Sequence, residues 1–257
     1  LRTRLNRPNS FMDSAHMDTE RIKDILEDMK SARVAVYGDF AIDAYWILDP
    51  RGSEESVETG LQGQAVGEQY YTLGGAANVA ENMLALQPES VLTIGAIGED
   101  IFGRELTRQL NELGADTSGL VRQDEHFDTV TFAKRYLKQE EQPRIDFGFH
   151  NRHMVGTDRA LLEHLERALS EYDALVFNQQ VPGTLNYPNF VREVKRLFKR
   201  YDDAIVLLDS RHYAEYFGSL SKKANEIEAA YLCGDDYEPG ATVPLPEVRY
   251  HARTLYD

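Results

Sequence analysis

The sequence of 257 residues has little cysteine, little positive charge and no long hydrophobic run. Its single cysteine, Cys233, cannot form an internal disulfide, and neither a stretch of about 18 apolar residues nor a signal-type N-terminus occurs. Only 28 Lys and Arg stand against 43 Asp and Glu, so the formal charge is −15 and a basic patch for duplex nucleic acid has no evident source. We therefore expect a cytoplasmic protein with neither nucleic acid nor a membrane as a partner.

Several motifs that define common enzyme classes are also missing. The sequence contains no G-x-x-x-x-G-K-[ST], which excludes a P-loop, and no G-x-S-x-G nucleophile elbow. The glycines between Gly95 and Gly103 superficially resemble a dinucleotide fingerprint, but their spacing is G-x-x-G-x-D-x-x-G, so we reject that cofactor site. His150 and His153 are the only closely spaced histidines, and alone they do not predict a zinc site.

What is present predicts one α/β domain. A content of 42% hydrophobic and 10% aromatic residues is typical of a globular protein of this length. Short apolar runs predict buried strands at 33–40, 91–98, 174–178 and 204–209, and helical spacing of apolar residues predicts helices at 19–30, 76–87, 101–113, 158–171 and 188–200. This alternation indicates a mainly parallel sheet between two layers of helices over residues 18–257, preceded by a disordered leader at 1–17.

Two segments break the alternation. Residues 55–73 and 128–149 are rich in Thr, Val, Tyr, Phe and Gly and alternate in part, which predicts strands outside the main sheet. We expect them to form a small antiparallel flap. Ligands of open α/β sheets bind beyond the carboxyl ends of the strands, and a flap over that crevice would exclude water.

Polar residues and glycines occur at the end of the first predicted strand and just before the helix predicted at 76–87. Asp39 and Asp43 come at the end of the first strand, where carboxylates either accept hydroxyl groups of a ligand or serve as turn and capping residues. Gly74 and Gly75 lead into a helix whose first turn presents Asn78, which suits either a polar ligand or an ordinary turn. The spacing leaves both pairs of alternatives open.

Cations occur in the flap segments. Lys134, Arg135 and Arg144 would favour an anionic ligand if their side chains pointed inward. A solvated strand face is the more frequent arrangement for such residues, and the residues themselves do not decide between the two.

Taken together, the segments GDFAID, GGAANVA, TIGAIGEDIFG, RIDFG and KANEIEAA resemble the ribokinase-like (PfkB-type) carbohydrate kinase family from about residue 32 to the end of the chain. RVAVYGDFAIDAYW, the GGAANVA spacing and LLDSR most resemble its heptose-7-phosphate kinase branch. The resemblance implies a three-layer fold with a small β lid, a homodimer formed through that lid, and ATP- and Mg²⁺-dependent phosphorylation of a sugar or sugar phosphate.

The resemblance also implies roles for individual residues. On the acceptor side, Asp43 would bind sugar hydroxyls, Gly74 and Gly75 would form the hinge beside the substrate-contacting Asn78, and Lys134 and Arg144 would contact a phosphate or hydroxyls of the acceptor. On the nucleotide side, Asp209 and Arg211 would face the phosphates, and Asn225 and Glu228 form the N-x-x-E pattern that organises magnesium, water and phosphate.

Two departures from the family pattern limit what the resemblance implies. The G-A-G-D segment that carries the family's catalytic base does not occur, so the base is unknown. We expect a fold without its C-terminal quarter, either part of a longer protein or a natural remnant. In NQQVPG at 178–183, only Gly183 agrees with the sugar-phosphate relatives. A non-catalytic sugar-binding protein and a nucleoside kinase of the same fold therefore remain alternatives.

Overall fold

The computed structural model describes residues 19–181, 188–218, 220–238 and 240–256, so the expected leader at 1–17 and Gly183 lie outside the described residues. The helices are α1 (Thr19–Met29), α2 (Ala76–Ala85), α3 (Ile101–Glu112), α4 (Val155–Glu171), α5 (Pro188–Arg200), α6 (Glu226–Leu232) and α7 (Leu245–Tyr256), with short 3₁₀ turns η1 (Pro50–Gly52) and η2 (Ala214–Phe217). The strands are β1 (Arg33–Gly38), β2 (Phe40–Leu48), β3 (Val66–Gly75), β4 (Ser90–Gly98), β5 (Asp116–Gln123), β6 (Val130–Leu137), β7 (Glu140–Phe147), β8 (Ala174–Gln179), β9 (Ile205–Ser210) and β10 (Ser221–Lys222).

The central sheet has six strands in the order β10-β9-β8-β1-β4-β5, and its neighbouring strands pair in parallel. Strand β1 lies in the middle, with Tyr37 opposite Ile94 of β4 on one side and Phe177 of β8 on the other. Such a strand is buried on both faces, which is why it reads as a continuous apolar run. The predicted α/β class with a mainly parallel sheet is confirmed.

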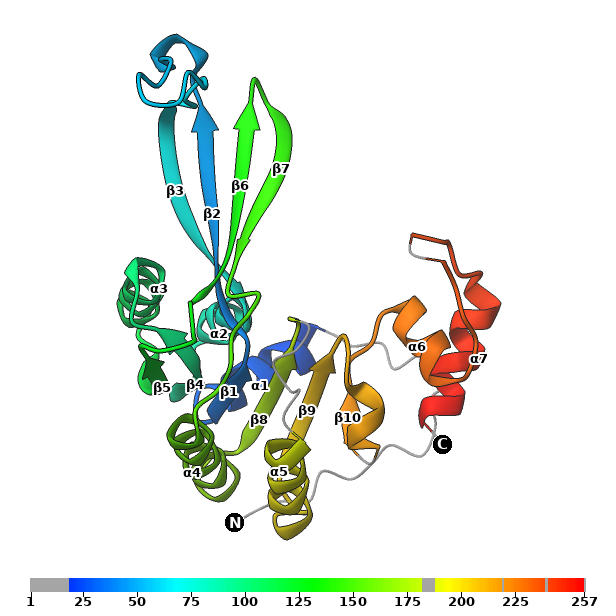
Figure 1. The fold of residues 1–257 in the computed structure, drawn as a ribbon. Coiled ribbons are helices and arrows are strands. Elements are labelled where there is room, and N and C mark those ends of the chain that lie inside the picture. The colour runs from blue at the N-terminus through cyan, green and yellow to red at the C-terminus, as the bar shows by residue number, and fades with distance from the viewer. Residues whose placement is uncertain (1–18, 182–187, 219, 239, 257) are drawn as a thin grey trace.

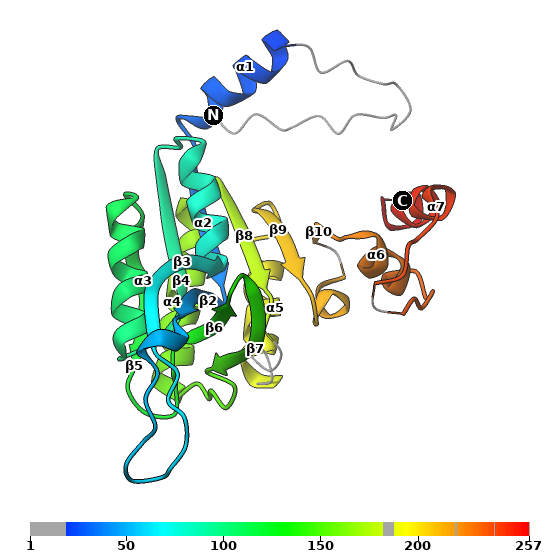
Figure 2. The same ribbon diagram turned by 90° about the horizontal axis from the view of Figure 1, so that it is seen from above.

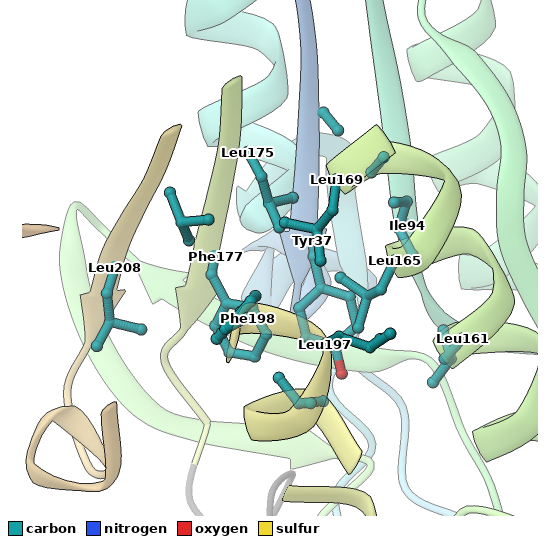
Figure 3. Packing of buried hydrophobic residues seen from close by; sticks show 14 of the residues in the cluster. Tyr37, Ile94, Leu161, Leu165, Leu169, Leu175, Phe177, Leu197, Phe198 and Leu208 are labelled. Carbon is teal, nitrogen blue, oxygen red and sulfur yellow. The ribbon is translucent and has the colours of Figure 1, made fainter. Parts of the chain in front are cut away.

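Each face of this sheet carries its own hydrophobic core, as the alternation of side chains along a strand requires. Ala35 and Tyr37 of β1 face the core that α4 and α5 cover, and Figure 3 shows Tyr37 and Phe177 packed among the leucines of those helices. Val36 faces the opposite core, which α2 and α3 cover. Two helix layers therefore enclose the sheet, and the three-layer prediction is confirmed.

The second sheet has four strands in the order β3-β2-β6-β7 and stands off the carboxyl edge of the central sheet (Figure 1). The antiparallel pairs β2·β3 and β6·β7 are joined through a parallel pair, β2·β6, so this lid is mixed rather than antiparallel as expected. Residues 55–65 of the expected flap segment form a loop with an isolated bridge between Glu55 and Gln62, and pairing in β3 begins at Val66.

The larger difference between expectation and structure concerns residues 40–48. We expected a turn after the first strand, but these residues form the lid strand β2. Its residues alternate: Ile42 and Ala44 are fully buried, whereas Asp43 and Tyr45 between them are half-buried. The apolar face packs on the core under α2 and α3, and the polar face is turned away from it. This alternation is present in the sequence, but the adjoining apolar run of β1 conceals it.

Helix α1 lies apart from the sheet layers (Figure 2) and has no buried residue, although Ile22, Ile25 and Leu26 share one face. Helices α6 and α7 follow the β10 edge of the central sheet (Figure 1). Within the described ranges, no helix has the length and apolar character needed to cross a bilayer.

Replacing Phe177 tests how much the core under α4 and α5 contributes to stability. This ring is fully buried and stacks on Tyr37 with centroids 4.5 Å apart, so Phe177→Ala should lower the free energy of unfolding by about 3–5 kcal/mol in urea denaturation. Phe149→Ala removes an equal ring that is 80% exposed and should change it by less than about 0.5 kcal/mol. Similar losses in both variants would contradict the assignment of this core.

Candidate functional site

The strand order itself locates a crevice. The chain proceeds from β1 to β4 and β5 on one side, and then places β8 and β9 on the other side of β1. The order therefore reverses between β1 and β8, and in open α/β sheets ligands bind beyond the carboxyl ends of the strands at such a point. Here these ends are the paired residues Gly38 and Asn178, with Asp209 of β9 next to Asn178.

Asp39 lies at this crevice, but backbone amides occupy its carboxylate. Its Oδ2 accepts hydrogen bonds from the backbone N–H groups of Gln180 at 2.7 Å and Val181 at 2.8 Å. Of the two readings that the sequence left open for this aspartate, the structure favours the capping one.

The di-glycine segment lies at the base of the lid. Gly75 has a φ of 53°, and a Cβ there would lie 2.3 Å from the carbonyl oxygen of Asp39, so only glycine fits. Gly74 has room, because its Cβ would lie 3.5 Å from that of Ala41. Asn78 is exposed in the first turn of α2, where its Oδ1 accepts a hydrogen bond from Asn82 at 3.2 Å. The glycine requirement is therefore specific to Gly75.

Asp43 lies on the polar face of β2 and forms an ion pair with Lys134 of β6. Asp43 Oδ2 and Lys134 Nζ are 3.1 Å apart, and each side chain is 22% exposed. Lys134 also donates a hydrogen bond to the Tyr45 hydroxyl at 3.2 Å. Burial alone would lower the pKa of Lys134, but the contacts with Tyr45 and Asp43 outweigh it and raise the pKa. Lys134 is thus held as a cation on the lid.

Arg144 of β7 lies on the same side of the lid. It binds Asp146 through two hydrogen bonds of 2.5 and 2.8 Å, and its guanidinium lies 4.4 Å from the centre of the Phe132 ring. The hydrogen bond to Asp146 raises the pKa of Arg144, and Asp43 adds to this rise electrostatically. The lid therefore brings Asp43, Lys134 and Arg144 within electrostatic reach of one another.

A stack of tyrosines continues this polar face, and sequence reasoning did not single it out. Tyr45 lies between Tyr70 of β3 and Tyr136 of β6, with ring centroids 4.7 and 6.3 Å apart. Lys134 Nζ lies 4.9 Å from the centre of the Tyr45 ring. The only available signal was the placement of tyrosines in lid segments, and the stacking depends on strand register.

A cavity of about 20 Å³ opens at the switch point and is lined by Tyr37, Gly38, Asn178 and His153 among others. It has the volume of one water molecule and is too small for a sugar. Asp43 and Asn78 do not line it, so their joint contact with one ligand stays a prediction.

Asp209 and Arg211 lie on the other side of the crevice, at the end of β9. Asp209 accepts a hydrogen bond from Asn178 Nδ2 at 3.2 Å and forms an ion pair of 3.3 Å with Lys223. Arg211 is exposed, and its backbone N–H donates to the Gln179 carbonyl at 2.9 Å. A second pocket of about 320 Å³ lies here, with Arg211, Lys223 and Glu228 in its lining.

Asn225 and Glu228 of the N-x-x-E pattern form the capping box of α6. Asn225 Oδ1 accepts from the Glu228 backbone N–H at 2.8 Å, and Glu228 Oε2 accepts from that of Asn225 at 2.9 Å. The described residues contain no cluster of three or more side chains suited to hold a metal. Mg²⁺ beside a nucleotide is usually held by one or two carboxylates together with phosphates and water, and Glu228 in the pocket wall fits that donor set.

Gln179, part of the divergent NQQVPG segment, is a functional candidate that the sequence did not reveal. It is 1% exposed, and its Oε1 accepts from Ser210 Oγ at 3.0 Å and from the His212 N–H at 3.2 Å. Its Nε2 donates to the Val181 carbonyl at 2.6 Å. This amide therefore joins the loop after β8 to the loop after β9.

A six-stranded parallel sheet enclosed by helices, with a separate four-stranded β lid at its carboxyl edge, defines the ribokinase-like class of α/β proteins. A family model described as pfkB family carbohydrate kinase matches residues 31–234, and the chain belongs to that family.

Similar curated proteins are the bifunctional protein HldE of Wolinella succinogenes, 30% identical over 225 residues, and that of Coxiella burnetii, 30% identical over 212 residues. These matches cover 85% and 81% of this chain, but the chain spans only 45% and 43% of the two relatives.

Among solved structures, Arabidopsis thaliana ribokinase complexed with ribose and ATP has a TM-score of 0.60 at 14% identity, and Xylella fastidiosa fructokinase with bound ATP has 0.57 at 17%. Each alignment covers 88% of this chain and 69% of the neighbour, and at these identities the likeness shows the fold alone.

The two adjacent glycines at the lid base should respond differently to alanine. Gly75→Ala places a methyl group 2.3 Å from a carbonyl oxygen at a positive φ and should lower the free energy of unfolding by at least about 1–3 kcal/mol. Gly74→Ala, with its nearest contact at 3.5 Å, should stay within about 1 kcal/mol of the unmodified chain in urea denaturation. Equal effects of the two substitutions would refute this assignment.

Proposed function

We propose that this chain binds the acceptor and the nucleotide of an ATP-dependent sugar-phosphate kinase. The observation that carries the proposal is the ion pair of Asp43 and Lys134 on the lid, with Arg144 within electrostatic reach. A carboxylate accepts hydrogen bonds from sugar hydroxyls, whereas a lysine and an arginine bind a phosphate. The three side chains therefore match an acceptor that carries both groups.

A heptose phosphate is the acceptor we favour. The HldE relatives support this choice, and so does the presence of two cations on the lid, which an unphosphorylated sugar would not need. Asn78, with its exposed amide at the start of α2, would add a contact to a hydroxyl next to the Gly74–Gly75 turn.

On the nucleotide side, Arg211 and Lys223 would bind phosphate oxygens in the pocket beside α6. Glu228 would hold a magnesium ion together with the phosphates, and Asn225 would keep Glu228 in place through the capping box. The ion would neutralise charge on the transferred phosphoryl group. Asp209 is held by Asn178 and Lys223, so its proposed part is to orient that lysine.

The catalytic base is unassigned, and the proposal covers binding by these residues. We further propose a cytoplasmic homodimer that associates through the lid. A non-catalytic sugar-binding protein and a nucleoside kinase are the competing functions. Calorimetric titration with sedoheptulose 7-phosphate, fructose 6-phosphate and adenosine separates them, together with an assay of ADP formation from MgATP. Tight binding of adenosine alone would overturn the sugar-phosphate proposal.

Removing the charge of Lys134 from the lid should weaken binding of a phosphorylated sugar. Lys134→Met should reduce the affinity for sedoheptulose 7-phosphate by about 10–100-fold, because a hydrogen bond to a charged group contributes about 1.5–3 kcal/mol. Lys138→Met removes the same charge from the exposed β6–β7 turn and serves as the matched control with unchanged affinity. Calorimetry at constant ionic strength measures both, and equal losses in the two variants would count against a specific site.

Two substitutions distinguish the proposed role of Glu228 in MgATP binding from the role of Asn225 in stabilising the start of α6. Glu228→Gln preserves the capping box, since glutamine also serves at that position, and should keep Tm within about 2 °C while weakening MgATP binding about tenfold. Asn225→Ala should lower the free energy of unfolding by about 0.5–2 kcal/mol. Glu226→Gln, an exposed neighbour on the same helix, is the control for charge. Unchanged MgATP affinity in Glu228→Gln would contradict the proposed magnesium role and show that Glu228 serves only to cap α6.

A further inference from the structure

Asp39 is the only residue between the central strand β1 and the lid strand β2. The central strand β1 ends at Gly38, and the lid strand β2 begins at Phe40. The other strand at the base of the lid, β3, ends opposite this point, because Phe40 pairs with Gly75. Asp39 therefore lies at the base of the lid, where β2 and β3 meet the central sheet.

Three parts of Asp39 are hydrogen-bonded to two segments, the end of β8 with the two residues after it and the start of α2. Its N–H donates to the carbonyl of Asn178 at the end of β8 at 3.3 Å, and its carbonyl accepts from Ala76 at the start of α2 at 2.9 Å. Its carboxylate accepts from the N–H groups of Gln180 and Val181, at 2.7 and 2.8 Å. Bonds from backbone amides to an ionised carboxylate are among the stronger hydrogen bonds in proteins.

Close packing around Asp39 leaves little room for the backbone to slip. A Cβ on Gly38 would lie 2.0 Å from the Asn178 carbonyl oxygen, and one on Gly75 would lie 2.3 Å from that of Asp39. The lid base, the start of α2 and the end of β8 thus touch through backbone atoms. A change in lid angle at Asp39 would either carry the Gln180–Val181 segment with it or break the carboxylate bonds.

The contacts continue from this segment to the nucleotide side. Gln179 accepts from the His212 N–H and from Ser210 Oγ through its side chain, and its carbonyl accepts from the Arg211 N–H. Val181 in turn accepts from Gln179 Nε2. An unbroken series of hydrogen bonds therefore runs from Asp39 to the loop that carries Arg211.

We propose that Asp39 is a positioning residue that couples the angle of the lid to the Gln180–Val181 segment and to the loop following β9. Its carboxylate does not bind a ligand in this role. It makes the lid and the Arg211 loop move as one unit, so that a change in the lid angle also moves the loop that carries Arg211. This inference concerns mechanical coupling and holds whichever small molecule the lid covers.

The chain contains its own reporter pair for the test. Trp46 of β2 is the only tryptophan, and Cys233 after α6 is the only cysteine and is partly exposed. A dansyl-type acceptor on Cys233 therefore reports the distance from the lid to α6 by time-resolved energy transfer from Trp46. Hydrogen exchange read by mass spectrometry reports the Gln180–Val181 amides in the same samples.

In Asp39→Ala we expect exchange of the Gln180–Val181 amides to rise at least about tenfold, together with a broader Trp46-to-acceptor distance distribution. Asp39→Asn keeps one acceptor oxygen and should lie between the alanine variant and the unmodified chain in both measurements. If the alanine variant does not fold, the asparagine variant alone decides, because both readings must still shift together.

The matched control is Asp49→Ala. Asp49 also accepts a backbone N–H, that of Arg51 at 3.0 Å, but in the loop at the far end of β2. It should leave both measurements unchanged. Faster exchange at Gln180–Val181 with an unaltered distance distribution would reduce Asp39 to a local loop cap and overturn the proposal. The same result in the Asp49 variant as in the Asp39 variant would also overturn it.

Discussion

The junction between β1 and β2 is the constraint on which the rest of the structure depends. The chain leaves a parallel sheet after Gly38 and enters a differently oriented sheet one residue later, at Phe40. The backbone of β8 lies so close that position 38 has no room for a side chain, and position 75 is restricted in the same way by Asp39. Because both sheets meet here, the crevice lies between the lid and the carboxyl ends of β1 and β8.

The charges on the lid and beside β9 follow a common arrangement in a protein of net charge −15. On the lid, Asp43 is paired with Lys134, and beside β9, Asp209 is paired with Lys223. Each pair lies beside an arginine, Arg144 or Arg211. A strongly acidic protein repels anions at long range, and these cations are local positive charges that oppose this repulsion.

Much of the fold was predictable from local patterns, because apolar runs and helical spacing depend on neighbouring residues. The strands β1, β4, β8 and β9 and the helices α2, α3 and α5 begin and end within a few residues of their predicted limits. The prediction was wrong where one pattern overlapped another, as at β2. It also missed β5, an edge strand rich in small and polar residues that pairs with β4. The antiparallel flap was wrong because strand direction depends on which distant strand is the partner.

The residue types and their order along the chain determined the class of the protein. It is an acidic α/β chain whose segments GDFAID, GGAANVA and KANEIEAA resemble carbohydrate kinases. The tertiary structure alone decided what those residues touch. In the folded chain the Asp39 carboxylate accepts hydrogen bonds from the backbone amides of Gln180 and Val181. Asp43 forms an ion pair with Lys134, on a strand far away in the sequence. The physical reason is that a side chain's partners depend on strand register and on approaches of a few ångströms between distant segments, which the order of residues does not specify.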